Sequence, residues 1–201
     1  MQNLSLTIRR GEHTAIIGES GAGKTTLASL LLRLWEPDAG TISYDGVPHT
    51  KLSPEASRAY FGAALQGSWL FSASIRDNFL RLRGDIHETA IWHALETAQL
   101  ADVVRALPAG LDEPLGMNAS RLSGGQRSRL LTALALAGDA PILLLDEPTT
   151  MLDISLRAQI MELLLRLRAA RGLGMLLISH ERELLRDFAD EIHVLEAGRV
   201  R

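Results

Sequence analysis

The feature that most constrains the fold is the glycine-rich octapeptide Gly18-Glu19-Ser20-Gly21-Ala22-Gly23-Lys24-Thr25, which fits G-x-x-x-x-G-K-[ST] in full. The residues before it, Thr14 to Ile17, form a short apolar run typical of a buried strand. After it, leucines recur at helical spacing from Leu27 to Leu34. A strand, a glycine turn and a helix in this order predict a phosphate-binding loop, and a glycine turn that binds nothing is the weaker alternative.

The residue types of this loop suit polyphosphate chemistry. Glycines let the backbone wrap around phosphates with its N–H groups pointing inward, and the following helix presents its positive end. Lys24 is expected to reach the β and γ phosphates, and the Thr25 hydroxyl to ligate Mg²⁺. The residues expected to contact the nucleotide here are Gly18, Ser20, Gly21, Ala22, Gly23, Lys24, Thr25 and Thr26.

The composition and net charge exclude several classes of protein and of binding site. The 201 residues suit one ordinary domain, and a net charge of −3 argues against a dedicated nucleic-acid binder, which usually has a basic excess. The absence of cysteine excludes disulfides, thiol catalysis and cysteine-ligated metal sites. No apolar run approaches the ~20 residues of a membrane span, and no signal peptide is recognisable. The chain is therefore expected to be cytosolic, with any membrane role acting through a partner.

Strand and helix patterns alternate along most of the chain. Alternating apolar residues predict a strand from Asn3 to Arg9, and Asp85 with Glu88 suggests a cap for a helix reaching about Leu100. Further strands are expected at 14–17, 41–44, 142–145, 175–178 and 192–195, and further helices from 25, from about 123, at 155–170 and at 181–188. This order predicts an α/β fold with a mostly parallel sheet flanked by helices. A helical subdomain is expected at about 67–138, inserted into a core of 1–66 and 139–201.

A second candidate site follows the strand Ile142 to Leu145, which ends in Asp146 and Glu147. Ligands of parallel sheets gather beyond the carboxyl ends of the strands. Asp146 is therefore expected to hold Mg²⁺ directly or through water, and Glu147 to act as general base on the attacking water. Alone, the two carboxylates would equally suit a solvated loop.

The pentapeptide Leu122-Ser123-Gly124-Gly125-Gln126 precedes a predicted helix and suits a second anion site at its N-terminus. Ser123 would also serve as an ordinary helix cap. With these motifs in place, the chain resembles the nucleotide-binding domain of ATP-binding cassette (ABC) proteins over nearly its whole length. GESGAGKT resembles the Walker A loop, ILLLDE the Walker B strand and LSGGQ the family signature. Gln66 corresponds to the Q-loop, Asp153 to the D-loop and His180 to the switch histidine.

The resemblance implies a P-loop NTPase fold with an N-terminal antiparallel β portion and an inserted helical subdomain. It also implies a head-to-tail dimer that sandwiches each ATP between one chain's Walker motifs and the other's signature, so that Ser123, Gly125 and Gln126 contact the nucleotide in trans. Gln66 would touch Mg²⁺ and the water, His180 the γ-phosphate and Glu147, and Asp153 would communicate across the dimer. The implied metal ligands are Thr25, Gln66 and Asp146.

The resemblance implies an ATPase that powers a membrane transporter from the cytoplasmic side of the membrane. The run from Gly67 to Asn78 resembles exporters, so export is expected. A soluble ABC ATPase acting on ribosomes or DNA is the alternative, and homodimer and heterodimer are equally allowed. Gln66 by itself could be any strand-end residue, and Trp69 to Phe71 suit either a core or a docking patch. Relatives stack adenine on an upstream aromatic residue to which no residue corresponds here, so the chain reads as a minimal or truncated cassette.

Overall fold

A computed structural model of the chain describes residues 4–138, 140–149, 152–171, 173–180, 182–186 and 188–200. By its contacts the chain divides into two compact units. The first comprises residues 1–66, 140–147 and 171–201, and the second comprises 67–139 and 148–170. The domain ranges expected from the sequence stay a prediction.

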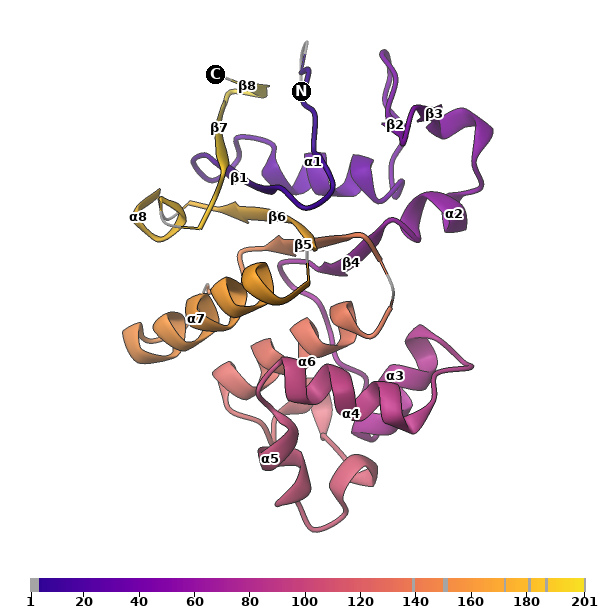
Figure 1. Cartoon of the computed structure of the whole chain (residues 1–201), viewed down its shortest axis with the longest axis vertical. Helices are drawn as coiled ribbons and strands as arrows, with labels where there is room; N and C mark the ends of the chain where they lie inside the picture. Colours follow the sequence, from indigo (N-terminus) through magenta and orange to yellow (C-terminus); the bar gives the residue numbers. More distant parts are fainter. Residues whose placement is uncertain are drawn as a thin grey trace. The chain divides into compact units, whose positions relative to one another are not determined.

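The first unit is built on a six-stranded sheet in the order β4-β5-β6-β1-β7-β8 (Figure 1). Its strands are β1 (His13–Ile17), β4 (Phe61–Ala64), β5 (Ile142–Asp146), β6 (Gly174–Ser179), β7 (Glu191–Glu196) and β8 (Arg199–Val200). All neighbours pair in parallel except β7 and β8, which are antiparallel. The sequence-based prediction of an α/β fold with a mostly parallel sheet is confirmed.

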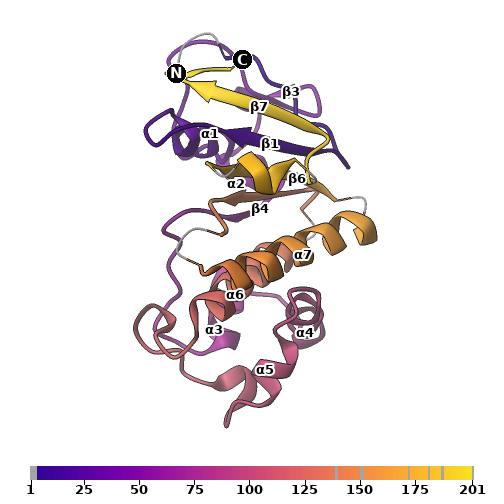
Figure 2. The same ribbon diagram turned by 90° about the vertical axis from the view of Figure 1, so that its left-hand side faces the viewer.

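The central strands of this sheet are wholly buried. Every residue of β1, β5 and β6 is buried, which fits their continuous apolar sequences. Helix α1 (Lys24–Leu31) packs its buried side, including Leu27 and Ala28, against a core that contains Leu144 and Ile178 of the sheet. Figure 2 shows β7, β1, β6 and β4 following one another across the sheet.

The expected strand from Asn3 to Arg9 is not formed. Asn3 lies outside the described residues, and residues 4–9 have no regular secondary structure. The alternation of apolar residues still predicts the inward-facing side chains correctly, because Leu4, Leu6 and Ile8 pack against the core of the first unit. The physical reason for the error is that alternation predicts which side chains are buried, whereas a strand also requires a partner for its backbone hydrogen bonds.

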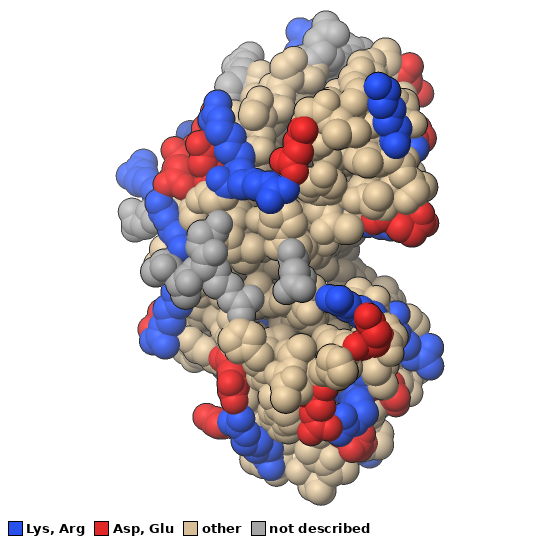
Figure 3. All heavy atoms as spheres, turned by 45° about the vertical axis from the view of Figure 1, so that its right-hand side comes forward, with Lys and Arg blue, Asp and Glu red and all other residues tan. Residues whose placement is uncertain are grey.

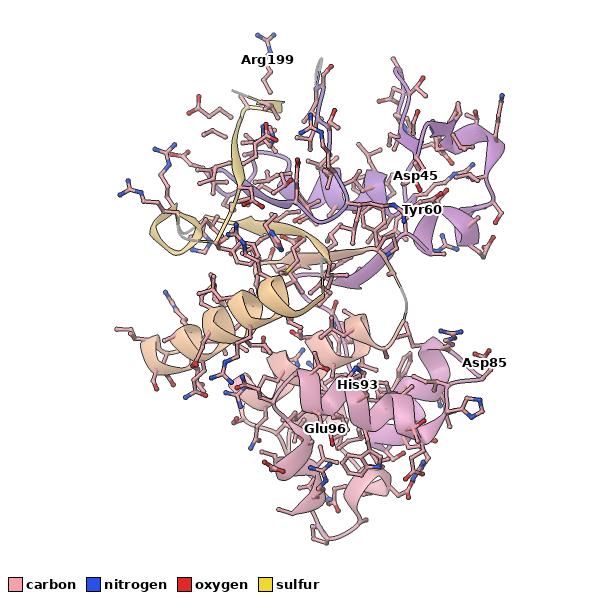
Figure 4. All side chains as sticks on the ribbon, in the orientation of Figure 1. Asp45, Tyr60, Asp85, His93, Glu96 and Arg199 are labelled. Atoms are coloured by element: carbon pink, nitrogen blue, oxygen red, sulfur yellow. The ribbon has the colours of Figure 1, made fainter. Side chains whose placement is uncertain are left out.

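The first unit also carries an antiparallel hairpin, β2 (Ser43–Tyr44) with β3 (Val47–Pro48). Tyr44 stacks on Tyr60 with ring centroids 5.2 Å apart, and Asp45 in the turn pairs with Arg10. Figure 4 labels Asp45 and Tyr60 on this side of the unit. The remaining helices of the unit are the 3₁₀ turn η1 (His49–Lys51), α2 (Pro54–Arg58) and α8 (Arg182–Leu185).

The second unit is helical. It contains α3 (Ile75–Leu82), α4 (Glu88–Thr97), α5 (Ala101–Arg105), η2 (Gly110–Asp112), η3 (Met117–Ala119), α6 (Gly124–Leu136) and most of α7 (Ile154–Arg171). Arg76 of α3 donates to Glu88 of α4 and to Asp112 of η2, each at 2.7 Å, and so joins three elements. Glu96 of α4, labelled in Figure 4, accepts from Arg105 at 2.6 Å.

Two helices of the second unit begin at a serine that caps them. Ser74 caps α3 and Ser123 caps α6, each in a complete capping box. The suggested cap at Asp85 is wrong, because α4 begins at Glu88 with His87 as its N-cap and Asp85 pairs with Arg83. Among the described residues, no helix combines the length and the apolar character needed to cross a bilayer.

Candidate functional site

The loop after β1 has the backbone of a phosphate cradle. Gly21 has φ +82° and Gly23 φ +105°, conformations that side-chain-bearing residues rarely adopt. At Gly18 the reason for glycine is space, since an added Cβ would lie 2.4 Å from the carbonyl oxygen of Leu195 in β7. The loop is therefore pressed against the sheet at its start and left-handed where it enters α1, the first helix after the turn.

Lys24 is the first residue of α1 and is 8% exposed. Its ammonium donates to the carbonyl oxygens of Gly18 at 2.8 Å and Glu19 at 3.0 Å, and it lies 3.9 Å from Oε1 of Glu147. An ammonium has three donors in a flexible arrangement. The ammonium therefore lies against the loop backbone, where it can exchange its carbonyl partners for phosphate oxygens.

Asp146 ends β5, next to Thr25 of α1. The Thr25 hydroxyl donates to Oδ2 of Asp146 at 3.2 Å, and Oδ1 is buried without a hydrogen-bond partner. Burial raises the pKa of the Asp146 carboxyl above its ordinary value; hydrogen bonding from Thr25 partly offsets this shift, and the charge of Glu147 adds to it. A buried, unsatisfied carboxylate oxygen beside a hydroxyl suits Mg²⁺, which takes one or two carboxylates and completes its shell with water and phosphate.

Glu147 follows directly and has φ +55°, a left-handed conformation that is uncommon for a residue with a side chain. Its amide donates to the Ile178 carbonyl at 2.9 Å, and its carboxylate is 2.8 and 2.9 Å from Nδ1 of His180. His180 comes one residue after β6, the strand beside β5. The parallel register therefore brings together two residues that are 33 positions apart.

Gln66 is placed by the strand that the sequence did not predict. β4 ends at Ala64 and pairs in parallel with β5, with Ala64 opposite Leu145. The backbone N–H of Gln66 lowers the pKa of Asp146 and so opposes part of the larger rise caused by burial. The run Gly62-Ala63-Ala64 has weak strand propensity, so only the neighbouring β5 identifies it as a strand. Gln66 is exposed and is the last residue of the first of the three segments that make up the first unit.

The signature residues lie in the second unit. The Ser123 hydroxyl accepts from the Gln126 amide at 3.2 Å, and the Gln126 side chain accepts from the Ser123 amide at 2.9 Å. The hydroxyl is an acceptor in this cap, so the cap does not use its hydrogen. The backbone N–H groups of Gly124 and Gly125 lie in the first turn of α6, where a helix offers no carbonyl acceptor of its own. Capping and anion binding are therefore compatible at this helix start.

Asp153 also lies in the second unit, where its carboxylate accepts from the Leu156 amide at 2.9 Å and caps α7. Arg157, one turn along α7, donates to the Leu152 carbonyl at 2.8 Å. The loop before α7 is thus tied to the helix at both residues.

The structure brings the sequence-predicted residues together in two groups. In the first unit the residues around the loop and the strand ends are Gly18, Ser20, Gly21, Ala22, Gly23, Lys24, Thr25, Thr26, Gln66, Asp146, Glu147 and His180. In the second unit they are Ser123, Gly125, Gln126 and Asp153. Sequence reasoning did not single out Arg127 and Ser128, whose side chains bond to backbone carbonyls far along the chain, because such bonds leave no pattern in the sequence.

Comparisons with known proteins agree with this arrangement. The family model described as ABC transporter matches residues 1–150. The chain is 38% identical to an ATP-dependent lipid A-core flippase of Neisseria meningitidis serogroup B over 100% of this chain and 32% of the relative. It is 42% identical to the flippase of the same name from Burkholderia orbicola over 100% of this chain and 33% of the relative.

Among solved structures, a bacterial Atm1-family ABC exporter with ATP bound matches with a TM-score of 0.88 and 34% identity, covering 98% of this chain and 34% of the exporter chain. The chain thus spans about a third of the length of the relatives that it matches. The family model covers most of the chain, and the two flippases align along all of it. The chain belongs to the ABC transporter family.

Proposed function

We propose that this chain binds and hydrolyses Mg-ATP as a head-to-tail dimer and thereby powers export by a membrane-spanning partner. The observation that carries the proposal is the arrangement of Lys24, Asp146, Glu147 and His180 at the ends of β1, β5 and β6. The exporter structure that the chain resembles has ATP bound, which supports ATP as the nucleotide. The flippases named ATP-dependent support coupling to transport.

The chain's residues have separate roles in this reaction. The Lys24 ammonium exchanges the Gly18 and Glu19 carbonyls for β and γ phosphate oxygens and neutralises their charge. The Thr25 hydroxyl and Asp146 would hold Mg²⁺, which supplies charge neutralisation at the phosphates when bound. The side-chain amide oxygen of Gln66 would contribute to the same shell. The loop amides from Ser20 to Thr26 cradle the remaining oxygens.

Glu147 orients and deprotonates the attacking water. Water oxygen bonds to the γ-phosphorus while the bond from that phosphorus to the bridging oxygen breaks, giving ADP and phosphate, and the water proton passes to the Glu147 carboxylate. His180 holds both carboxylate oxygens and so keeps Glu147 in one orientation. Ser123, Gly125 and Gln126 of a second chain would close the site over the γ-phosphate, with Asp153 at the dimer interface.

The position of the chain in the cell follows from the same proposal. A chain with these motifs works beside the cytoplasmic face of a membrane, attached through its transmembrane partner. On the face that Figure 3 shows, acidic and basic side chains are interspersed, whereas a nucleic-acid surface gathers basic ones into a patch. Tight binding of the purified chain to ribosomes or DNA at physiological salt would favour the soluble alternative instead.

The test is the substitution Glu147→Gln, which keeps the size of the side chain and removes its basicity. We expect turnover to fall by at least ~100-fold, the scale of general base catalysis, while ATP is still bound. Because hydrolysis no longer releases the nucleotide, the variant should run as a dimer in gel filtration with Mg-ATP and as a monomer without it. Turnover at the wild-type rate would contradict the role of Glu147.

A further inference from the structure

The chain passes between its two units at four places, and two of them directly follow residues of the proposed ATP site. Gln66 is the last residue before one crossing and Glu147 the last before another. The first residues of the second unit at these crossings are Gly67 and Pro148. Any displacement of Gln66 or Glu147 is therefore passed through the covalent chain to these residues.

Helix α6, which starts at the signature, holds the chain just after both crossings. Nη2 of Arg127 donates to the carbonyl oxygen of Ser68 at 3.0 Å, and Ser68 lies two residues after Gln66. The Ser128 hydroxyl donates to the carbonyl oxygen of Pro148 at 3.0 Å, one residue after Glu147. Both bonds lie within the second unit, and both come from consecutive residues of the second turn of α6.

The same end of α6 is closely packed against the start of α7. A Cβ added at Gly124 would lie 3.3 Å from Leu152 Cδ2, and one added at Gly125 would lie 2.7 Å from Leu156 Cδ2. Pro148 has a fixed φ and cannot absorb rotation there, and Glu147 before it is already in a left-handed conformation. The backbone is therefore restricted in φ at both Glu147 and Pro148.

We infer that Arg127 and Ser128 are positioning residues that couple the signature helix to the segments carrying Gln66 and Glu147 of the same chain. The inference rests on the proposed function and deepens it. In the proposed dimer, each signature contacts the ATP held by the other chain. Two hydrogen bonds to the crossings would then link the signature's engagement at one ATP to the placement of the glutamine and the base at the other.

The test uses Ser128→Ala in the full chain, with Ser128→Thr as the variant that keeps the hydroxyl. We expect Ser128→Ala to lower kcat about fivefold, the factor that corresponds to one hydrogen bond, and to change the KM for ATP less than about twofold. Ser128→Thr should restore kcat. Amide hydrogen exchange of residues 149–153 should be about fivefold faster in Ser128→Ala, and Arg127→Gln should have the same effect on residues 67–71.

Thr132 supplies the matched control. It is a buried residue of α6, one turn beyond Ser128, and its hydroxyl donates to the Ser128 carbonyl within the same helix at 3.0 Å. Thr132→Val should leave kcat and both exchange rates unchanged. If Ser128→Ala matches wild type in kcat and in amide exchange of residues 149–153, the inference is overturned while the ATPase stands. A wild-type chain without ATP turnover would contradict the proposed function. The amide exchange rates would still test the hydrogen bonds that Arg127 and Ser128 donate to Ser68 and Pro148.

Discussion

At the residue scale, the site contains residues whose burial or backbone conformation destabilises the fold when no ligand is bound. Asp146 is 2% exposed with one carboxylate oxygen unsatisfied, and Glu147 has a backbone conformation disfavoured for its residue type. Unfavourable features of this kind gather where a structure is preorganised for binding. Their cost should be measurable in the ligand-free chain and should disappear when the ligand is present.

Asp146→Asn provides that measurement. Because burial raises the folded-state pKa of Asp146 above its ordinary value, the folded state binds the proton more tightly than the unfolded state does. The group therefore destabilises the fold most above its folded pKa, and this penalty is relieved as pH falls through that pKa. We expect Asp146→Asn to raise the ligand-free Tm by roughly 3 °C at neutral pH, and the gain to shrink as the pH approaches 4.

The same variant should lose the Tm increase that Mg-ATP gives to wild type, since stabilisation by a ligand follows its affinity. Asp38 offers the control, because it is exposed, and Asp38→Asn should leave both behaviours unchanged. A ligand-free Asp146→Asn that melts below wild type at neutral pH would contradict the proposed balance between stability and binding. Thermal melts with and without Mg-ATP supply both readings.

At the element scale, the structure separates the two interpretations of Ser123. Ser74 and Ser123 cap α3 and α6 with the same capping box, so their removal should have similar structural costs. We expect Ser74→Ala and Ser123→Ala each to lower the free energy of unfolding by about 1 kcal/mol. Only Ser123→Ala should also weaken ATP-dependent dimerisation, measured by gel filtration in the Glu147→Gln background. If the two variants dimerise equally well, Ser123 acts only as a helix cap and does not contact the nucleotide.

At the scale of the whole molecule, the proposed dimer makes each ATP site from parts of two chains. Ser123→Asp keeps a good N-cap but places a negative charge opposite the γ-phosphate, and Glu147→Gln lacks the base. Each variant alone should be inactive. A mixture assembles dimers in which the Walker motifs of the Ser123→Asp chain meet the signature of the Glu147→Gln chain, so one site is intact.

With random pairing, an equal mixture should regain about a quarter of wild-type turnover, since about half of the dimers have one of two sites complete. The measurement is phosphate release as the two variants are titrated against each other at constant total protein. A mixture as inactive as its components would show that the sites do not exchange parts between chains.

Much of the fold follows from local sequence. The octapeptide from Gly18 to Thr25 is flanked by its own strand and helix signals, and the apolar runs at 142–145 and 175–178 are buried strands, as their sequences predict. Signals failed where the decisive partner is remote in sequence. Residues 4–9 alternate as a strand does but have no ladder partner, while β4 lacks strand propensity and is formed by its pairing with β5.

For the candidate site, the sequence by itself determined which chemistry is present: a phosphate loop, two acids after a strand, a signature and a histidine in one order. Only the tertiary structure decided how these groups meet. The parallel register of β5 and β6 brings His180 to Glu147, β4 brings Gln66 to Asp146, and α6 reaches Ser68 and Pro148 through Arg127 and Ser128. The physical reason is that a motif fixes residue types at short spacing, whereas hydrogen bonds between distant segments depend on strand order and helix packing, which the whole chain establishes together.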